Sequence, residues 1–506
     1  MIKKNFSFIL VLGMIFTIGL EAQPLLLESK ADLVKNYMSD IQADDLKKHL
    51  YILASDDYEG RETAERGQKM AADYIARHFY QLGLKGPVEN QPNPYLQSIE
   101  FKSRQISKAS ISSSNYTPEF PKEYFGLGYF NLDKTSAPLI SAGYGLESDL
   151  ENLDLKNKGV IIIDGVPKDK NGKALIEKAP RLQQRIANLK EKGAVFVIVT
   201  YHNSEEFEAR TQFPRAFMSK PGLTLGQEEM RMAALPTFMM HPDAVSKLMG
   251  SKPGKIKWTQ PVTVNIETKL DIRKTYSENV LGFMEGTDLK DEVLVVTSHY
   301  DHVGIINGEI HNGADDDGSG TVGVLEMAEA FAKAKADGNG PRRSILFMTV
   351  TGEEKGLFGS AYYADNPIFP LSSTIANLNV DMIGRIDPER EGSDPYVYII
   401  GSDMLSSDLH KIHESVSASY VPDLTMDYKY NSQDDPQRFY YRSDHYNFAK
   451  NNIPVIFYFS GTHEDYHQPT DTPDKIEYEL MEQRARLIFA TAWELANREK
   501  RPLVDK

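Results

Sequence analysis

Five short stretches that are apolar, or alternate with polar residues at 378–382, are spaced along the second half of the chain, and they restrict its fold more than any other feature. The runs lie at 293–296, 345–348, 378–382, 397–400 and 455–459. A run without polar alternation is typical of a strand that is buried on both faces. Helical periodicity is found between and after the runs, for example at 322–334 and 478–497. This alternation predicts an α/β domain with a mostly parallel central sheet.

The length of 506 residues predicts two or three domains. We expect residues 23–125 and 263–506 to form one domain, with an amphipathic helix at 64–82 in its N-terminal part. Between these segments, residues 126–262 have a different pattern of short apolar runs and Gly- and Lys-rich stretches. That pattern predicts a small β-rich inserted domain.

The first residues read as a targeting segment. Lys3 and Lys4 precede an apolar run at 6–20, and Ala22 offers a small residue for cleavage. The run is shorter than the roughly 20 residues that span a membrane. We therefore predict a signal peptide at 1–22 and a periplasmic or secreted protein without stable membrane insertion after cleavage.

Composition excludes several functions. The chain has 57 basic and 72 acidic residues, for a formal net charge of −15, and no long basic block. A nucleic-acid partner is therefore not expected. Because the chain has no cysteine, disulfides, thiol catalysis and cysteine-bound zinc are excluded. Any metal ion must be held by His, Asp and Glu.

Ionisable residues follow the predicted strands. In open α/β sheets, ligands bind at the carboxyl ends of the strands. Imidazole and carboxylate groups suit zinc, and a pair of ions needs a bridging carboxylate. The candidate residues are His299, Asp301, Asp315, Asp316, Asp317, Glu353, Glu354, Asp381, His463, Asp465 and His467.

Two local patterns suggest a division of roles. His299 and Asp301 are two residues apart, so in an extended chain Asp301 lies on the same face and could orient the imidazole. Of the adjacent Glu353 and Glu354, one could bind metal while the other acts as a base. Taken alone, the Asp triplet is typical of a solvated turn and the Glu pair of an exposed helix start; their ordered occurrence after buried strands favours a metal site.

These motifs resemble the dinuclear zinc exopeptidases, a family that includes bacterial leucyl aminopeptidases, glutamate carboxypeptidase II and the transferrin receptor (metallopeptidase family twenty-eight). The resemblance covers about residues 40–125 and 270–500. It implies a three-layer zinc-exopeptidase fold, and residues 126–262 stand where some members have a protease-associated domain. The matching stretches are 298–301, 313–320, 352–359, 379–382, 443–445 and 467–472.

The resemblance also implies roles for single residues. Two Zn²⁺ ions per chain would be held by five residues, with Asp316 as the bridge and a cis peptide bond directly after it. Glu353 would be the general base, Asp301 would orient His299, and Tyr440 would help to polarise the substrate carbonyl. The five implied metal ligands are His299, Asp316, Glu354, Asp381 and His467.

The function that the resemblance favours is an exported zinc-dependent aminopeptidase acting on peptides. A carboxypeptidase is an alternative, with Arg385, Arg438 and Arg442 as candidates to face a substrate carboxylate. A glutaminyl cyclase, which uses one zinc ion, and a non-catalytic binding protein are further alternatives, but the complete ligand set argues against both. His302 is an alternative to His299 as the first ligand, and otherwise no ligand role is expected for the remaining polar residues near the motifs, namely His311, Asp444, His445 and His463. Arg61 stands in a loop that we expect near the cleft, in a structural role.

Overall fold

The computed structural model of the chain describes residues 27–169, 171, 173–225, 235–251 and 261–506. The predicted signal peptide, residues 1–22, lies outside these residues. Among the described helices, none combines the length and the apolar character needed to cross a membrane.

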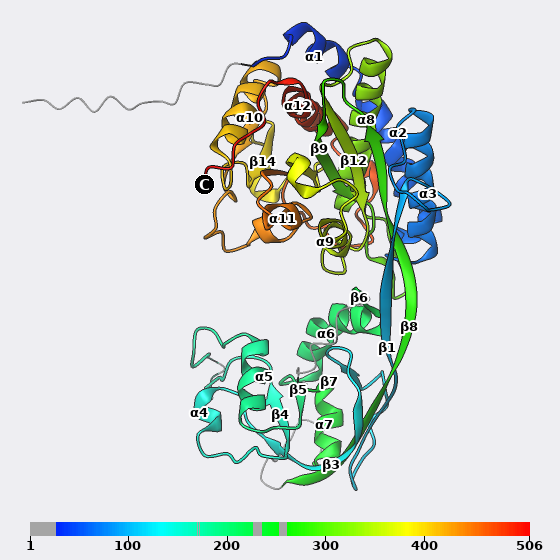
Figure 1. Ribbon diagram of the computed structural model, residues 1–506. Helices are drawn as coiled ribbons and strands as arrows, with labels where there is room; N and C mark the ends of the chain where they lie inside the picture. Colours follow the sequence, from blue (N-terminus) through cyan, green and yellow to red (C-terminus); the bar gives the residue numbers. More distant parts are fainter. Residues whose placement is uncertain (1–26, 170, 172, 226–234, 252–260) are drawn as a thin grey trace, which may run out of the picture.

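The described residues form helices and strands in alternation (Figure 1). The helices are α1 (Ala31–Met38), α2 (Ala43–Leu53), α3 (Arg66–Gln81), α4 (Glu147–Leu150), α5 (Leu182–Glu191), α6 (Ser204–Ser219), α7 (Pro242–Leu248), α8 (Gly320–Ala336), α9 (Phe358–Asp365), α10 (Ser407–Tyr420), α11 (His445–Ala449) and α12 (Tyr478–Asn497). The strands are β1 (Leu96–Ser112), β2 (Tyr124–Gly126), β3 (Leu132–Ser141), β4 (Gly159–Ile163), β5 (Phe196–Thr200), β6 (Gly222–Leu225), β7 (Thr237–Met240), β8 (Val262–Met284), β9 (Leu289–His299), β10 (Gly304–Ile306), β11 (Glu309–His311), β12 (Arg343–Val350), β13 (Thr374–Val380), β14 (Tyr396–Ile400), β15 (Thr425–Asp427) and β16 (Val455–Phe459).

The five apolar runs are strands β9, β12, β13, β14 and β16 of one sheet. Along the sheet the order is β15-β14-β16-β13-β9-β12-β8. The four central strands β16, β13, β9 and β12 are parallel, whereas β14 and β8 flank them in the antiparallel direction. The prediction of an α/β fold with a mostly parallel central sheet is confirmed.

Alternate residues of each central strand enter two different cores. On β9, Leu294 and Val296 pack with helices on one face, while Val293 and Val295 pack on the other. The first core is the larger and includes apolar residues of α1, α2, α3, α8, α10 and α12. This two-sided burial explains the continuous apolar runs within β9, β12, β14 and β16, since neither face meets water.

Strands β1 and β8 are long, and they connect this domain to a second lobe. They pair with each other in antiparallel fashion over most of their length. One end of β8 pairs with β12, and its other end pairs with β3 of the second lobe, which Figure 1 shows below the first. We call strands β2, β3, β4, β5 and β7 with helices α4–α7 the distal lobe.

The distal lobe has its own apolar packing on both faces of its sheet. Phe196 and Ile198 of β5 enter one cluster together with residues of α7. Val197 and Val199 of the same strand enter another cluster together with residues of α5 and α6. The segment expected to be β-rich therefore contains helices as well as strands, because the apolar runs of its strands need a cover on each side. Its identity as a protease-associated domain stays a prediction.

Candidate metal centre and active site

The predicted site residues come together where the parallel strands end. His299 is the last residue of β9, Glu353 and Glu354 follow β12, and Asp381 follows β13. The short helical turn η2 (Ala314–Ser319) leads into α8 and carries Asp316. Since parallel strands end at one edge of the sheet, residues that are distant in sequence meet there.

Asp316 lies at the centre of this cluster, between two imidazoles. Its Oδ1 is 3.3 Å from Nε2 of His299, and its Oδ2 is 3.0 Å from Nε2 of His467. Asp381 Oδ1 lies 3.6 Å from His299 Nε2, and Glu354 Oε1 lies 3.1 Å from His467 Nε2. The five residues implied as metal ligands thus form two groups that share the Asp316 carboxylate.

His302, which the sequence indicates only as an alternative to His299, belongs to the second group. Its Nδ1 is 3.0 Å from Glu354 Oε1 and 3.8 Å from Asp316 Oδ2. The side chain is fully buried, and neither ring nitrogen has a hydrogen-bond partner within the described residues. Position 302 lies beyond the end of β9, so the pleat of the strand does not fix its direction, and no spacing in the sequence could identify it.

Acidic groups outnumber basic groups in this buried cluster. Asp301, Asp316, Asp317, Asp381 and Asp444 are at most 7% exposed, and Glu353 and Glu354 lie beside them. Burial raises the pKa of Glu353 well above its ordinary value, and the charges of Glu354 and Asp381 raise it further. Such an excess of buried carboxylates is unfavourable unless cations compensate it.

The charges of the same carboxylates also change the pKa values of the histidines. Burial opposes protonation of His299, yet the carboxylates of Glu353 and Asp381 raise the pKa of His299 well above its ordinary value. Burial likewise opposes the positive form of His467, but Glu354 and Asp316 raise the pKa of His467 to about 10. Protonation of these imidazoles therefore compensates negative charge of the carboxylates that a bound metal cation could compensate instead. Unpartnered buried atoms of Asp316, Glu354 and His467 fit the same conclusion.

The Asp301 carboxylate does not make the expected contact with the His299 imidazole. His299 Nδ1 lies 3.1 Å from the main-chain carbonyl of Asp301, whereas the Asp301 carboxylate is 3.9 Å away. That carboxylate instead accepts hydrogen bonds from Thr63 Oγ1 and from the main-chain N–H of Glu353. Asp301 thus orients His299 through its backbone and fixes the position of Glu353 through its side chain.

The neighbours of Asp316 in the triplet have supporting contacts. Asp315 accepts hydrogen bonds from Gly384 N and Ser319 Oγ and pairs with His463 at 3.2 Å. Asp317 accepts from the main-chain N–H groups of His299, Gly320 and Met382. The peptide bond between Asp316 and Asp317 is cis, as the resemblance implies.

Arg61 is a buried residue whose contribution the sequence did not reveal. Its guanidinium donates hydrogen bonds to the main-chain carbonyls of Leu53, Tyr300, Asn312 and Gly313. These contacts connect the segment after His299 to the segment before the Asp triplet. Arg61 therefore helps to hold the two halves of the ligand cluster in register.

A small pocket opens onto His299, Asp316, Glu353 and Asp381. Its wall includes Tyr466 and Arg442 together with apolar side chains, and the Tyr466 ring stacks on His467 at 3.9 Å. The structure does not bring Tyr440 to this wall. Tyr440 is buried and packs against Tyr441, His445 and Tyr446 instead. The apolar part of the wall consists of Met382, Phe439, Phe457 and Phe459.

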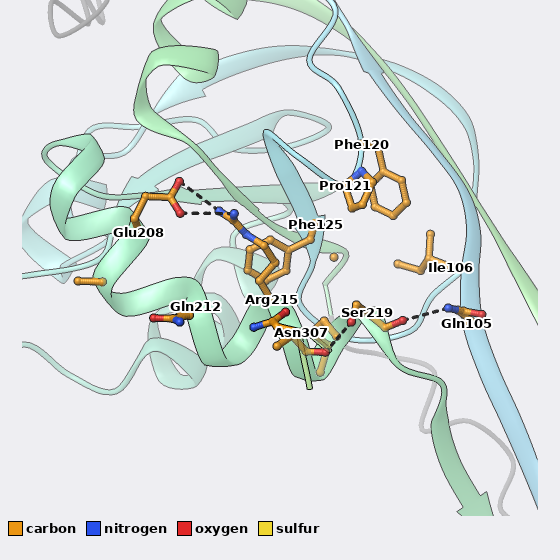
Figure 2. Close-up of a pocket in the computed structure, with 14 residues that line it drawn as sticks. Gln105, Ile106, Phe120, Pro121, Phe125, Glu208, Gln212, Arg215, Ser219 and Asn307 are labelled. Carbon is orange, nitrogen blue, oxygen red and sulfur yellow. Dashed lines mark hydrogen bonds and ion pairs between the residues drawn. The ribbon is translucent and has the colours of Figure 1, made fainter. Parts of the chain in front are cut away.

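Of the three arginines weighed for a substrate carboxylate, only Arg442 lines the pocket within the described part of the chain. Arg385 is paired with Asp465 at 3.1 Å, and the guanidinium of Arg438 lies over the ring of Tyr441. A larger cavity of about 640 Å³ lies elsewhere, between α6, β1 and Asn307 (Figure 2). Glu208 there is paired with Arg215, and the cavity contains no cluster of metal-binding side chains among the described residues.

Residues 279–492, which include the whole ligand cluster, match the model of peptidase family M28. The resemblance to this family is confirmed, and this part of the chain is an M28 peptidase domain, a hydrolase of peptide bonds.

Similar proteins with known names extend the match beyond this domain. Aminopeptidase YwaD of Bacillus subtilis is 26% identical over 91% of this chain and 87% of its own length. A solved zinc aminopeptidase from Bacillus subtilis superposes with a TM-score of 0.60 at 19% identity, covering 92% of this chain and 98% of that one. An aminopeptidase from Aneurinibacillus sp. strain AM-1 gives 0.59 at 18% identity, covering 94% and 98%. These likenesses to solved structures confirm the α/β fold with its mostly parallel central sheet.

Proposed function

We propose that this protein is an aminopeptidase that holds two zinc ions and removes N-terminal residues from peptides. The observation that carries the proposal is the position of Asp316, whose two carboxylate oxygens face His299 on one side and His467 on the other. A carboxylate placed in this way can bridge two cations. The full-length likeness to aminopeptidase YwaD supports the activity.

The donor groups fit zinc. His299, Asp381 and one oxygen of Asp316 would hold one ion, and His467, Glu354 and the other oxygen would hold the second. His302 lies within reach of the second ion. Nitrogen and carboxylate ligands in this number are typical of catalytic zinc sites that keep one position open. The chemistry that a zinc pair supplies when bound is activation of water and polarisation of a carbonyl.

The side chains of the protein supply the proton transfers. Glu353 lies 4.0 Å from His299 Nε2, and its main-chain N–H is fixed by Asp301. Glu353 would take a proton from the attacking water and give it to the departing amine. Because burial raises the pKa of Glu353, its carboxylate binds a proton readily, as a base in this role requires.

The pocket wall suggests which substrates are accepted. Met382, Phe439, Phe457 and Phe459 provide an apolar surface next to the cluster, so we expect apolar N-terminal residues to be preferred. Because Tyr466 lines this pocket, we expect it to donate a hydrogen bond to the substrate carbonyl, in the role first expected of Tyr440.

Release of nitroaniline from leucyl-p-nitroanilide, with lysyl- and glutamyl-nitroanilide for comparison, tests the proposal. We expect the leucyl substrate to be cleaved fastest, activity to be lost after exhaustive chelation, and zinc to restore it. Activity that survives chelation would show that the carboxylates and imidazoles at the strand ends serve another purpose.

Arg442 supports a second candidate, a carboxypeptidase, because it places a cation at the pocket wall. Cleavage of an N-acylated dipeptide distinguishes the two activities, since such a substrate has a free carboxylate and no free amine. We expect no cleavage of it; cleavage that is lost in Arg442→Ala would favour the carboxypeptidase.

We also propose that the protein is exported. The charged start, the apolar run at 6–20 and Ala22 support this proposal. Mass spectrometry of protein purified from the culture medium or the periplasm should find a chain that begins near residue 23. An N-terminus at Met1 in the exported protein would contradict cleavage.

A further inference from the structure

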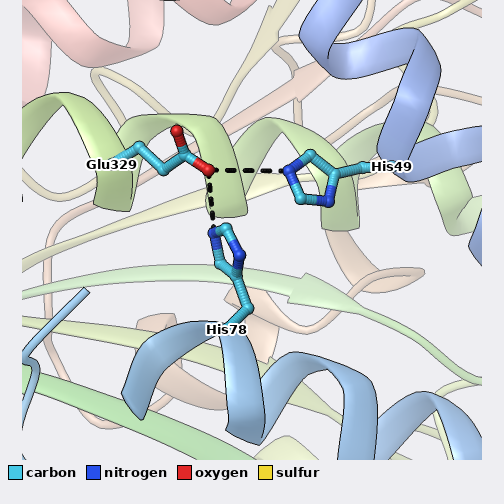
Figure 3. A group of neighbouring side chains, drawn as sticks. All are labelled: His49, His78 and Glu329. Atoms are coloured by element: carbon cyan, nitrogen blue, oxygen red, sulfur yellow. Dashed lines mark ion pairs between the residues drawn. The ribbon is translucent and has the colours of Figure 1, made fainter. Parts of the chain in front are cut away.

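A second group of imidazole and carboxylate side chains lies on the helices that cover the sheet. His49 is on α2, His78 is on α3, and Glu326 and Glu329 are on α8. Figure 3 shows His49 and His78 converging on the Glu329 carboxylate. None of these residues belongs to the ligand cluster described above.

The distances between the donor atoms match the edges of a zinc tetrahedron. With zinc–ligand bonds of 2.0–2.1 Å, neighbouring ligand atoms of a tetrahedral site are about 3.3 Å apart. Glu329 Oε1 is 3.2 Å from His78 Nε2 and 3.6 Å from His49 Nε2. Glu326 Oε1 is 3.5 Å from His49 Nε2. Three helices thus present ligand atoms of His49, His78 and Glu329 to one point, and Glu326 lies beside His49.

Two buried atoms of this group have no hydrogen-bond partner. Glu326 is 2% exposed, and its Oε1 accepts no hydrogen bond from the described residues. His78 Nε2 is likewise buried and unpartnered. Within the described chain, no lysine or arginine forms an ion pair with Glu326 or Glu329. A buried carboxylate without a cation is costly, and a bound cation would satisfy it.

One of the two imidazoles is already held in a way that leaves its Nε2 available. His49 Nδ1 lies 2.7 Å from Tyr74 Oη. A partner on the second nitrogen fixes the tautomer and orientation of a metal-binding imidazole.

We infer that His49, His78 and Glu329 form a structural zinc site separate from the catalytic centre, with the Glu326 carboxylate beside His49. Two imidazoles and a carboxylate suit zinc, and they disfavour Ca²⁺ and Mg²⁺, which prefer oxygen ligands. A cavity of about 450 Å³ lined by His49, His78 and Glu329 gives access from solvent. The ion would tie α2 and α3 to α8, the helix that directly follows the Asp triplet.

Zinc content of the full chain tests the inference. After saturation with zinc and gel filtration, mass spectrometry of the metal should find one equivalent fewer per chain in His49→Gln/His78→Gln than in the wild type. His410→Gln is the matched control, because His410 lies on α10 beside Ser402 and should change nothing. Equal zinc content in the wild type and the double variant would overturn the inference.

Glu329→Gln provides a second test that does not depend on the double variant being folded. Glu329 is 42% exposed, so its replacement should be tolerated. The rise in Tm on adding zinc to chelated protein should be smaller by a few degrees in this variant. An unchanged rise would contradict the structural site.

This inference rests on the proposed function only in part, because different results would contradict the helix zinc site and the zinc pair at the strand ends. Glu354→Gln should lose zinc and peptidase activity, whereas the helix variants should lose zinc and keep activity. A protein that cleaves peptides but has no helix-bound zinc would refute only this inference. A protein that binds zinc at the helices and has no zinc at the strand ends would refute only the proposed function.

Discussion

The strand-end cluster and the helix cluster use the same chemical groups in opposite surroundings. At the strand ends, seven acids surround three histidines, and the candidate ligands stand on strand ends, loops and the short turn η2. On the helices, two glutamates lie beside two histidines, and every residue stands within a regular helix. The first arrangement concentrates negative charge beside an open pocket, which suits catalysis. The second has fewer acids and stands on regular helices, which suits a structural role.

Glu353→Gln should separate the two clusters most strongly. Loss of the general base should lower kcat by about 10²–10⁴-fold while zinc content stays that of the wild type. Glu329→Gln is the counterpart on the helices and should leave kcat unchanged. Steady-state kinetics together with metal analysis of both variants checks this. Loss of zinc in Glu353→Gln would show that Glu353 is a ligand rather than the base.

Tyr466→Phe should have the next largest effect. Burial and the charges of Asp316 and Glu354 raise the pKa of Tyr466, so its hydroxyl stays protonated and available as a donor. Removing one donor to a developing oxyanion typically lowers kcat by about 10²-fold. Tyr440→Phe is the control, since Tyr440 does not line the pocket. A loss confined to Tyr440→Phe would restore the role that the sequence suggested.

His302→Gln should weaken metal binding at the strand ends without affecting the helices. Loss of an imidazole beside Glu354 should raise the dissociation constant of one zinc ion by about 10-fold or more, which competition with a chelator measures. His445→Gln is a matched control, because His445 is equally buried but stacks on Phe457. Equal affinities in the two variants would show that His302 only fills space beside Gly313.

Glu326→Gln should leave activity unchanged and alter only the stability of the zinc-free protein. Burial and the charge of Glu329 raise the pKa of Glu326 from 4.5 to about 8. The folded state therefore holds a proton that the unfolded state releases, so this group destabilises the fold as pH rises from 4.5 to 8. The variant should gain up to about 1.4 kcal/mol per pH unit relative to the wild type across that window.

Chelated samples of both proteins, unfolded with urea at several pH values, check this prediction. With zinc added, the order should reverse, because the wild type gains a stabilising ligand that the variant binds less well. A stability difference that does not change with pH would show that Glu326 is ionised in the fold.

Sequence periodicity predicted the strands well and the lobes less well. The runs at 293–296 and 345–348 became β9 and β12 because a strand covered on both faces needs apolar residues at every position. In the distal lobe the sequence indicates a helix ending near Lys192, where α5 lies, but α6 was missed, since α6 has only a weak apolar stripe and contains Pro214. A short amphipathic stripe of that kind gives little signal until its partner strand is known.

Some residues of the site could likewise be predicted from the sequence, and others could not. His299, Asp316, Glu353 and Asp381 were predictable because they stand where apolar strands end, and their motifs match a family. Arg61, His302 and Tyr466 were not, because a side chain on a loop takes its direction from tertiary contacts. The helix cluster was also missed, since His49, His78 and Glu329 each look like an ordinary residue of an amphipathic helix.

The sequence by itself determined the α/β architecture and the ligand types, because strand burial and the absence of cysteine are properties of composition and spacing. Only the tertiary structure decided which histidine meets which carboxylate. Asp316 lies between His299 and His467 because η2 places it there, and the helix cluster exists because α2, α3 and α8 pack side by side. Contacts between distant segments depend on how helices and strands pack together, and the periodicity of a single helix or strand does not determine that packing.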